Sequence, residues 1–315
     1  MPKVNGVNKG QALRNYVLNG YTEVWERGTS FTSSVGGQYT ADRWHEFKNA
    51  SAFAGSVSRQ LETVDGISQF TLQVRRDNGN TNTGGHFLSQ PMESEDSRRL
   101  RGKEVTLSFY ARKGADYSPT NNNLRVELES GTGFDQGPLS ALTGEVQIID
   151  EDVQLNDAWT KYVLRATVPS DSSQLRLRFI SQHTGTAGAN DVYFITRVSL
   201  TEGTTAQNEF QRAGESQQGE RELCARFYQT CRNPEFRGYT NNGNTRITYS
   251  CMLRTEMRAT PTIASTSGNY VNVRSPQANF AVCTVVDTKN VRFTIESAAT
   301  GLTSAEITGR LEAEL

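Results

Sequence analysis

The chain has few of the residues on which most catalytic and metal centres depend. Its 315 residues include 3 histidines and 4 cysteines. His45, His86 and His183 have no partner at a catalytic or metal-ligand spacing, and the cysteines form no CxxC pair. The residue pattern therefore disfavours both a histidine-dependent hydrolase and a zinc site.

Long apolar runs are also missing. No stretch approaches the roughly 20 apolar residues of a membrane-spanning helix, and the first residues lack the apolar core of a signal peptide. The cysteines are too few for a disulfide scaffold and all fall in the last third, at Cys224, Cys231, Cys251 and Cys283. We expect no membrane insertion, synthesis in a cytoplasm, and reduced thiols.

There is no excess of either charge. The 33 basic and 34 acidic residues give a formal net charge of −1, whereas a dedicated nucleic-acid binder is normally basic. Arginines recur on the polar faces of the expected strands, where they could bind anionic glycan or pair with acids. The balance of charge favours pairing for this set, which comprises Arg59, Arg75, Arg125, Arg165, Arg176 and Arg178.

The pattern that is present is an alternation of apolar and polar residues with a period of two. It recurs in segments separated by loops rich in Asn and Gly, at residues 71–75, 105–111, 124–129, 162–166 and 175–179. Such alternation is typical of antiparallel sheets with one buried face. We therefore predict a mainly β protein, with an N-terminal jelly-roll β-sandwich over residues 16–203.

Residues 16–44 contain a tight turn and two of the three tryptophans. The Asn19-Gly20 pair predicts a turn with positive φ, and a strand just after it. Trp25 and Trp44 each lie beside a charged residue, which is typical of a ring with a buried body and a polar edge.

Three motifs in this first region resemble a known family. They are N-G-x-x-E-x-W-x-R-G-T-S with Y-T-A-D-R-W at residues 19–44, L-R-G-K-E-V-T-L-S-F-Y-A-R at residues 100–112, and V-S-L-T-E-G at residues 198–203. Together they resemble the carbohydrate-binding-module-like jelly roll of bacteriophage tail-fibre and head-fibre proteins. The resemblance implies a sandwich fold and a place in a virion.

The composition changes after Gly203. Residues 204–219 are polar and are predicted to be a linker, and residues 1–15 a polar N-terminal arm. Residues 220–231 place apolar side chains at helical spacing and predict one short helix, which ends before Pro234. Alternation at residues 245–249 and 291–295 predicts strands, so residues 220–315 read as a helix followed by a smaller C-terminal β domain.

A second resemblance falls in this C-terminal region. L-C-A-R-F-Y at residues 223–228 and M-R-A-T-P-T at residues 257–262 resemble a C-terminal module of phage tail fibres. The resemblance implies a homotrimer, with Leu223, Phe227 and Tyr228 as candidate oligomerisation residues. Because so short a helix must dock its apolar side, the alternative partner is the β region next to it in the same chain.

Aromatic side chains are the candidates for ligand contact. Sugars stack on aromatic rings, and we single out Tyr39, Trp44, Tyr117 and Phe134 as possible glycan-binding residues. The alternative for each is core packing or anchoring of a loop. For Trp25 and Trp159 we expect the core.

A structural Ca²⁺ is implied by the first family resemblance alone. Related carbohydrate-binding modules hold this ion between their first and last strands. Glu23 matches the acid of the opening motif, and Asp191 lies just before the last strand. Oxygen ligands suit Ca²⁺, and the alternative is an ordinary turn with surface acids.

No residue pattern selects a catalytic pair. Glu23, Asp42, Glu127, Glu129 and Asp135 could supply two carboxylates to a glycosidase, but nothing in the sequence shows that any two face each other. We expect solvated strand-face acids and no enzyme activity.

Together with these observations, the two family resemblances imply a bacteriophage virion structural protein that is assembled in the host cytoplasm. It would be a trimeric tail fibre, spike or head fibre that binds host-surface glycan and is attached to other virion proteins through its N-terminal arm. The alternatives are a non-binding adaptor or capsid-decoration protein, a glycan depolymerase, and a secreted carbohydrate-binding module.

Overall fold

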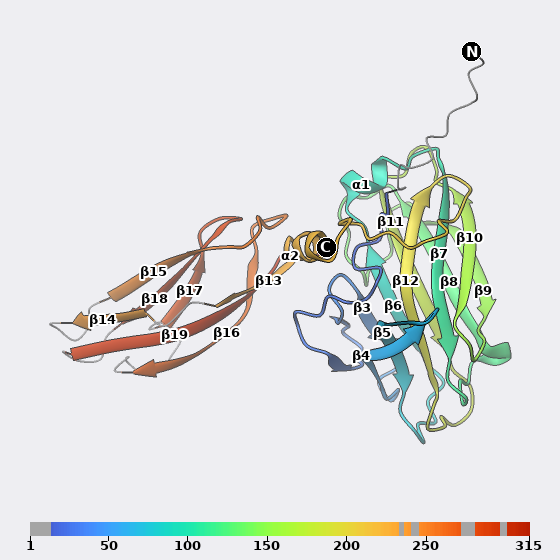
Figure 1. Ribbon diagram of the computed structural model, residues 1–315, viewed down its shortest axis with the longest axis horizontal. Coiled ribbons are helices and arrows are strands. Elements are labelled where there is room, and N and C mark those ends of the chain that lie inside the picture. The colour runs from blue at the N-terminus through green and yellow to red at the C-terminus, as the bar shows by residue number, and fades with distance from the viewer. Residues whose placement is uncertain (1–13, 233–235, 241–245, 272–280, 297–300) are drawn as a thin grey trace, which may run out of the picture. The chain divides into compact units, whose positions relative to one another are not determined.

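The computed structural model describes residues 14–232, 236–240, 246–271, 281–296 and 301–315. The chain divides into two compact units, one up to Glu220 together with Leu315, and one over residues 221–314. Both are built of antiparallel sheets (Figure 1), so the prediction of a mainly β protein with a sandwich and a smaller β domain is confirmed.

The first unit contains two sheets of six strands each. The first sheet has the spatial order β1 (Ser30–Thr32), β4 (Gly55–Val64), β5 (Ile67–Arg76), β12 (Val192–Glu202), β7 (Glu104–Lys113) and β10 (Thr160–Thr167). The second sheet has the order β2 (Gln38–Tyr39), β3 (His45–Lys48), β6 (Gly85–Pro91), β11 (Gln174–Gln182), β8 (Asn123–Gly131) and β9 (Val146–Gln154).

The strand order identifies the sandwich as a jelly roll. The eight strands from β5 to β12 change sheet at every connection except that from β8 to β9, and give the orders β5-β12-β7-β10 and β6-β11-β8-β9. In each sheet a strand from late in the chain lies between two earlier ones, which is the double Greek-key arrangement. A five-residue helix, α1 (Ser94–Arg98), and a 3₁₀ turn (Thr120–Asn122) connect strands.

The core lies between the two sheets and consists of alternate residues of their strands. On β8, Leu124, Val126 and Leu128 are fully buried, and on β11 Leu177 and Phe179 are too. The residues between them point to the outer face of the second sheet. One continuous apolar cluster therefore stabilises the unit, at roughly 25 cal/mol per Å² of apolar surface removed from water.

The predicted turn at Asn19 is present, but the predicted strand after it is not. Asn19 has a φ of 51°, and regular strand begins only at Ser30. The reason is a buried side chain: the Asn19 amide accepts hydrogen bonds from the Glu23 and Val24 amides and donates to the Val24 carbonyl. These local bonds replace a sheet ladder.

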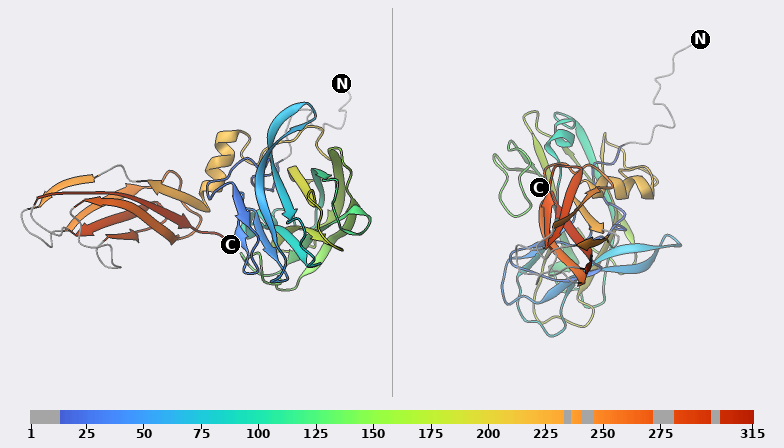
Figure 2. Two further views of the ribbon diagram at one scale, coloured as in Figure 1. Left: turned by 90° about the horizontal axis from the view of Figure 1, so that it is seen from below. Right: turned by 90° about the vertical axis from the view of Figure 1, so that its left-hand side faces the viewer.

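The β4–β5 hairpin extends away from the rest of the sandwich, as its light-blue ribbon shows in Figure 2. Its turn contains Asp65 and Gly66, both with positive φ. Leu61 and Ile67 are 65% and 55% exposed on it, while Arg197 of β12 donates a hydrogen bond to Asp65 at 2.8 Å.

The second unit contains two further antiparallel sheets. One consists of β13 (Tyr228–Arg232), β19 (Gly301–Glu312), β14 (Phe236–Thr240) and β16 (Thr262–Val271). The other consists of β15 (Arg246–Met252), β18 (Asn290–Glu296) and β17 (Ala281–Val285). β15 and β18 confirm the two strands predicted at residues 245–249 and 291–295. The helices among the described residues include none that is long and apolar enough to span a membrane.

The predicted helix over residues 220–231 is wrong in its extent. Helix α2 runs from Gln217 to Ala225, and Tyr228–Arg232 is strand β13. Tyr228 pairs with Glu312 of β19, so the ladder of the second unit ends the helix earlier than the apolar spacing suggested. Glu220, in the first turn, accepts hydrogen bonds from the Gly214 and Asn19 amides.

Candidate functional site

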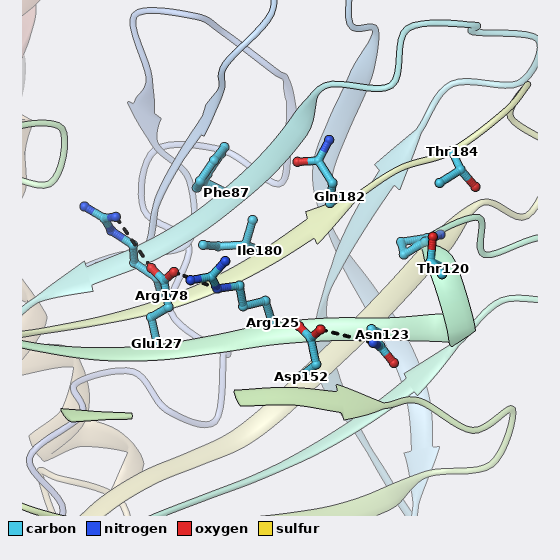
Figure 3. Close-up of a pocket in the computed structure, with 11 residues that line it drawn as sticks. Phe87, Thr120, Asn123, Arg125, Glu127, Asp152, Arg178, Ile180, Gln182 and Thr184 are labelled. Atoms are coloured by element: carbon cyan, nitrogen blue, oxygen red, sulfur yellow. Dashed lines mark hydrogen bonds and ion pairs between the residues drawn. The ribbon is translucent and has the colours of Figure 1, made fainter. Parts of the chain in front are cut away.

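A groove on the outer face of the second sheet is the candidate site (Figure 3). It has a volume of about 400 Å³ and crosses β6, β11, β8 and β9. Its lining combines apolar, amide, hydroxyl and charged side chains: Phe87, Pro119, Thr120, Asn123, Arg125, Glu127, Asp152, Arg178, Ile180, Gln182 and Thr184. Pockets that mix an apolar surface with a few polar groups are typical ligand sites.

Strand register brings these side chains together. On β11, Arg178 and Ile180 alternate with the core residues, and they face Glu127 and Arg125 of β8 across the ladder. Ile180 is also opposite Phe87 of β6. Since paired residues of antiparallel strands lie on one face, three strands far apart in the sequence contribute to one surface.

The apolar side of the groove centres on Phe87. Its ring stacks nearly parallel on that of Phe47 on β3, with centroids 4.3 Å apart and planes at 12°. Phe87 is half-buried, while its neighbour Ile180 is only 8% exposed. The stacked pair limits the orientation of the Phe87 ring, which together with Ile180 forms the apolar side of the groove.

The polar side is a network of arginines and carboxylates. Arg125 lies 2.9 Å from Glu127 and 2.7 Å from Asp150, and Arg178 lies 3.6 Å from Glu127. Asn123 donates to Asp152 at 3.1 Å. Among the four charged residues that line the groove, the two arginines balance Glu127 and Asp152, and Asp150 outside the lining adds a further acid beside Arg125, so the groove has no excess of positive charge.

Burial changes the ionisation of this network. It raises the pKa of Glu127 above its ordinary value, and Arg125 partly offsets that effect. Burial also lowers the pKa of the Arg178 guanidinium, against the attraction of Glu129 and Glu127. Glu127 is 3% exposed, and its Oε2 has no hydrogen-bond partner among the described residues. This oxygen is therefore a buried acceptor on the wall of the groove, 3.6 Å from Arg178 and without a hydrogen bond.

The other end of the same face is closed. Glu129 and Arg176 are completely buried, and Arg176 donates to Glu129 and to the carbonyls of Gly137, Pro138 and Ser140. The segment that connects β8 to β9 supplies those carbonyls. Glu129 is consequently a structural ion-pair partner, and the prediction that these strand-face arginines pair with acids is confirmed for Arg125, Arg176 and Arg178.

Two of the four aromatic residues predicted to contact glycan are buried, and that prediction is wrong for them. Trp44 is 0% exposed, packs 6.1 Å from the ring of Phe179, and donates from Nε1 to the Asn19 carbonyl at 3.1 Å. Tyr117 is 5% exposed and donates to the Asn123 carbonyl. Their polar atoms bond to backbone carbonyls in the interior, so both rings pack in the core.

The other two aromatic residues predicted to contact glycan, Tyr39 and Phe134, lie at the surface but outside the groove. Tyr39 is half-buried on the edge strand β2, with its ring 5.0 Å from that of His45 and the Arg27 guanidinium 5.2 Å from its centroid. Phe134 is 62% exposed, with Arg98 at 5.2 Å from its ring. A role for either in binding glycan stays a prediction.

Glu23 and Asp191 do not fit a shared calcium ion. Arg212 forms two hydrogen bonds to Glu23, at 2.6 and 3.1 Å, and the buried Arg76 lies 3.3 Å from Asp191. Asp191 also accepts a hydrogen bond from Ser118. Burial alone would raise the pKa of Asp191, but its hydrogen bonds with His183 and Ser118 lower it. Each carboxylate already has a cationic partner, and the described residues contain no group of three or more His, Cys, Asp or Glu placed to hold a metal.

The predicted oligomerisation residues pack mainly inside their own unit. Phe227 is 0% and Tyr228 2% exposed, and the Phe227 carbonyl accepts a hydrogen bond from the Ala313 amide. Leu223 is half-buried and Cys224 is a buried thiol. The alternative partner, the β region of the same chain, is therefore the one observed for Phe227 and Tyr228. The side chains of Cys231, Cys251 and Cys283 lie outside the described part.

Sequence reasoning did not select Phe87, Ile180 or Gln182. The alternation on β6 and β11 was a usable signal, because it separates the outward residues from the core. It does not show which outward residues meet, since β6, β11 and β8 are adjacent only in the folded sheet.

No protein-family model matches the chain, and a search of the curated proteins also finds no match. Among solved structures, it is similar to the enzymatically active domain of bacteriophage CBA120 tailspike protein 4, at 12% identity and a TM-score of 0.37 over 60% of this chain. That match covers only 21% of the tailspike chain.

Two carbohydrate-binding modules are also similar. One is a CBM4 (17% identity, TM-score 0.35, covering 59% of this chain and 98% of the module). The other is the CBM22-1 xylan-binding domain of Paenibacillus barcinonensis Xyn10C (16% identity, TM-score 0.35, covering 62% of this chain and 99% of the module). At these low identities and scores, the description of the fold rests on the strand order given above.

Proposed function

We propose that the chain is a bacteriophage virion structural protein, a homotrimeric tail-fibre, spike or head-fibre component that attaches to host-surface glycan. The observation that supports glycan binding is the groove on β6, β11, β8 and β9. There the Phe87 and Ile180 surface adjoins amide and carboxylate groups, among them Gln182 and Glu127. The virion setting rests on the two sequence resemblances.

The mechanism is binding without cleavage. The apolar surface receives the face of a sugar ring, and the exposed amides and the buried Glu127 carboxylate bond to its hydroxyls. Because the lining charges cancel, a neutral saccharide fits the groove. Single sites of this kind are weak, and three copies on one particle would bind a polymer through their combined effect.

The ion pairs support a non-catalytic role. A glycosidase needs one carboxylic acid and one carboxylate on either side of the bond that is cleaved. Glu127 lies between Arg125 and Arg178, and Glu129 forms a completely buried ion pair with Arg176. Each carboxylate is paired with arginine, which disfavours its use as a proton donor or a nucleophile.

The test is a glycan array probed with the full-length protein, its Phe87→Ala variant and a control, Phe70→Ala, at an exposed ring outside both pockets. We expect oligosaccharide binding by the parent and the control, and its loss in Phe87→Ala. No binding to any host-derived glycan would favour the adaptor or capsid-decoration alternative. Release of reducing sugar from host polysaccharide would favour the depolymerase, and native mass spectrometry tests the trimer.

A further inference from the structure

A second pocket lies on the outer face of the first sheet. Its volume is about 430 Å³, and β5, β12 and β7 contribute residues to it, together with the loops at Gly114, Asp157 and Asn190. It belongs to the opposite layer of the sandwich from the groove of Figure 3. The pocket and the groove share no lining residue.

The charge of this pocket differs from that of the groove. Its lining contains three cations, Arg75, Arg112 and Lys113, and one acid, Asp157. Glu62, outside the lining, pairs with Arg112 at 2.9 Å, and counting it still leaves one positive charge. The chain as a whole has a net charge of −1, so the excess is local.

Arg75 is the cation without an acidic partner. Among the described residues, its guanidinium has one hydrogen-bond acceptor, the Ala189 carbonyl at 3.0 Å, and no carboxylate. Arg112 and Lys113 differ in this respect, because Lys113 lies 2.6 Å from Asp157. A guanidinium has five N–H donors in a planar fork that matches a carboxylate or phosphate, so Arg75 keeps unused donors in the pocket.

Two aromatic rings hold Arg112 in place. The Arg112 guanidinium lies 3.9 Å from the centre of the Phe194 ring and 5.6 Å from that of Trp159, which also contact each other edge to face. Trp159, expected in the core from the sequence, is half-buried here instead. Stacking of this kind limits the rotamers of an arginine and so lowers the entropy lost when an anion binds.

A glycine shapes the wall beside them. The Gly114 amide donates to the Val192 carbonyl at 2.8 Å, and a Cβ on Gly114 would lie 2.3 Å from the Asn190 carbonyl oxygen. Only glycine permits this close approach. The pocket therefore has a fixed wall next to its cations.

We propose that this pocket binds the oxyanion of an acidic saccharide, a carboxylate or a phosphate group, with Arg75 as the main ligand-binding residue and Lys113 as a second. The site is independent of the neutral groove on the other sheet. A chain with both sites can bind a charged, branched surface polysaccharide through two different sugar units.

The test is saturation-transfer difference NMR on the full-length protein with three hexoses: glucuronate, glucose 6-phosphate and glucose. We expect one or both anions to bind and glucose not to bind at this site. Arg75→Gln should lower the affinity for the anion by about tenfold, which is the contribution of one charge-assisted hydrogen bond. Lys113→Gln should lower this affinity less, and 0.5 M NaCl should lower the affinity of the parent by screening the charges.

Arg165→Gln is the matched control. Arg165 is an exposed strand arginine that also bonds to a backbone carbonyl, that of Thr204, and it lies outside both sites. If only glucuronate binds, the site is a carboxylate site. If only glucose 6-phosphate binds, it is a phosphate site. If neither anion binds better than glucose, or if Arg165→Gln lowers binding as much as Arg75→Gln, the proposal is wrong. Thermal unfolding of each variant confirms that it is folded.

Discussion

The core of the sandwich and the groove on its second sheet are built from the same strands. On β8, Leu124, Val126 and Leu128 enter the core, while Arg125 and Glu127 line the groove. On β11, Phe179 packs inside and Ile180 outside. A shift of one residue would exchange the two sets, so stability and recognition depend on alternate positions along a single ladder.

This comparison explains which aromatic residues can contact a ligand. Trp44 and Tyr117 are large and conspicuous in the sequence, yet both fill the interior. Phe87 is in an ordinary alternating segment, yet it presents a ring to the groove, supported by Phe47. The position of a residue on its strand decided its role more than its size did.

Trp44→Ala should produce the largest effect on the core. Removing a fully buried tryptophan leaves a cavity and removes one of the two hydrogen bonds that the Asn19 carbonyl accepts, and we expect a loss of about 3–5 kcal/mol in the free energy of unfolding. The loss is measured by urea denaturation, from the unfolding transition of the first unit. A loss below about 1 kcal/mol would mean that the ring is not part of the core.

His45 sharpens the comparison because it lies on an outer-face position but is buried. Burial lowers its pKa to about 4 from 6.5, against the attraction of Glu46. The unfolded chain takes up the proton first, so stability is complete above about pH 6.5 and is lost as the pH falls towards 4, by an amount on the order of 3 kcal/mol.

The measurement for His45 is the unfolding free energy of the parent and of His45→Gln from neutral to acid pH. The variant should lose less stability than the parent on acidification. Identical pH profiles for the two proteins would contradict the burial of a neutral imidazole at this position.

Phe87→Ala should separate the groove from the core. We expect glycan binding about tenfold weaker, close to the value of one aromatic contact, with the melting temperature little changed because the ring is half-buried. Phe70→Ala, at an exposed ring on β5 outside both pockets, is the control and should leave binding within about 0.5 kcal/mol of the parent. Equal losses in both variants would remove the distinction between groove and surface.

Glu127→Gln should give the smallest effect, a change in the slope of stability with pH. Because burial raises the pKa of Glu127, its contribution to stability is complete below the ordinary glutamate pKa and is lost as the pH rises through the folded-state value. Glutamine cannot ionise, so the stability of the variant relative to the parent should increase as the pH rises above the ordinary glutamate pKa towards neutral. A constant difference over that range would show that Glu127 is not desolvated.

The alternation in the sequence was sufficient to predict the sandwich, since apolar residues of period two mark the buried face of each strand. It was not sufficient for the start of the first strand, where the buried Asn19 side chain replaces a ladder. Nor could it give the end of helix α2, which depends on the pairing of Tyr228 with Glu312.

The groove was harder to predict because its parts come from strands that are not consecutive. Phe87, Ile180 and Glu127 become neighbours only when β11 inserts between β6 and β8. The arginines on these strands were recognised as partners of acids, but the buried Glu127 acceptor beside an apolar surface depends on tertiary packing.

The most direct test of glycan recognition is a crystal structure of the full-length protein with the oligosaccharide that binds best on the array. We predict a sugar ring packed on Phe87 and Ile180, with hydroxyls bonded to Glu127 and Gln182. A sugar bound elsewhere on the protein, with the groove occupied only by solvent, would contradict this account.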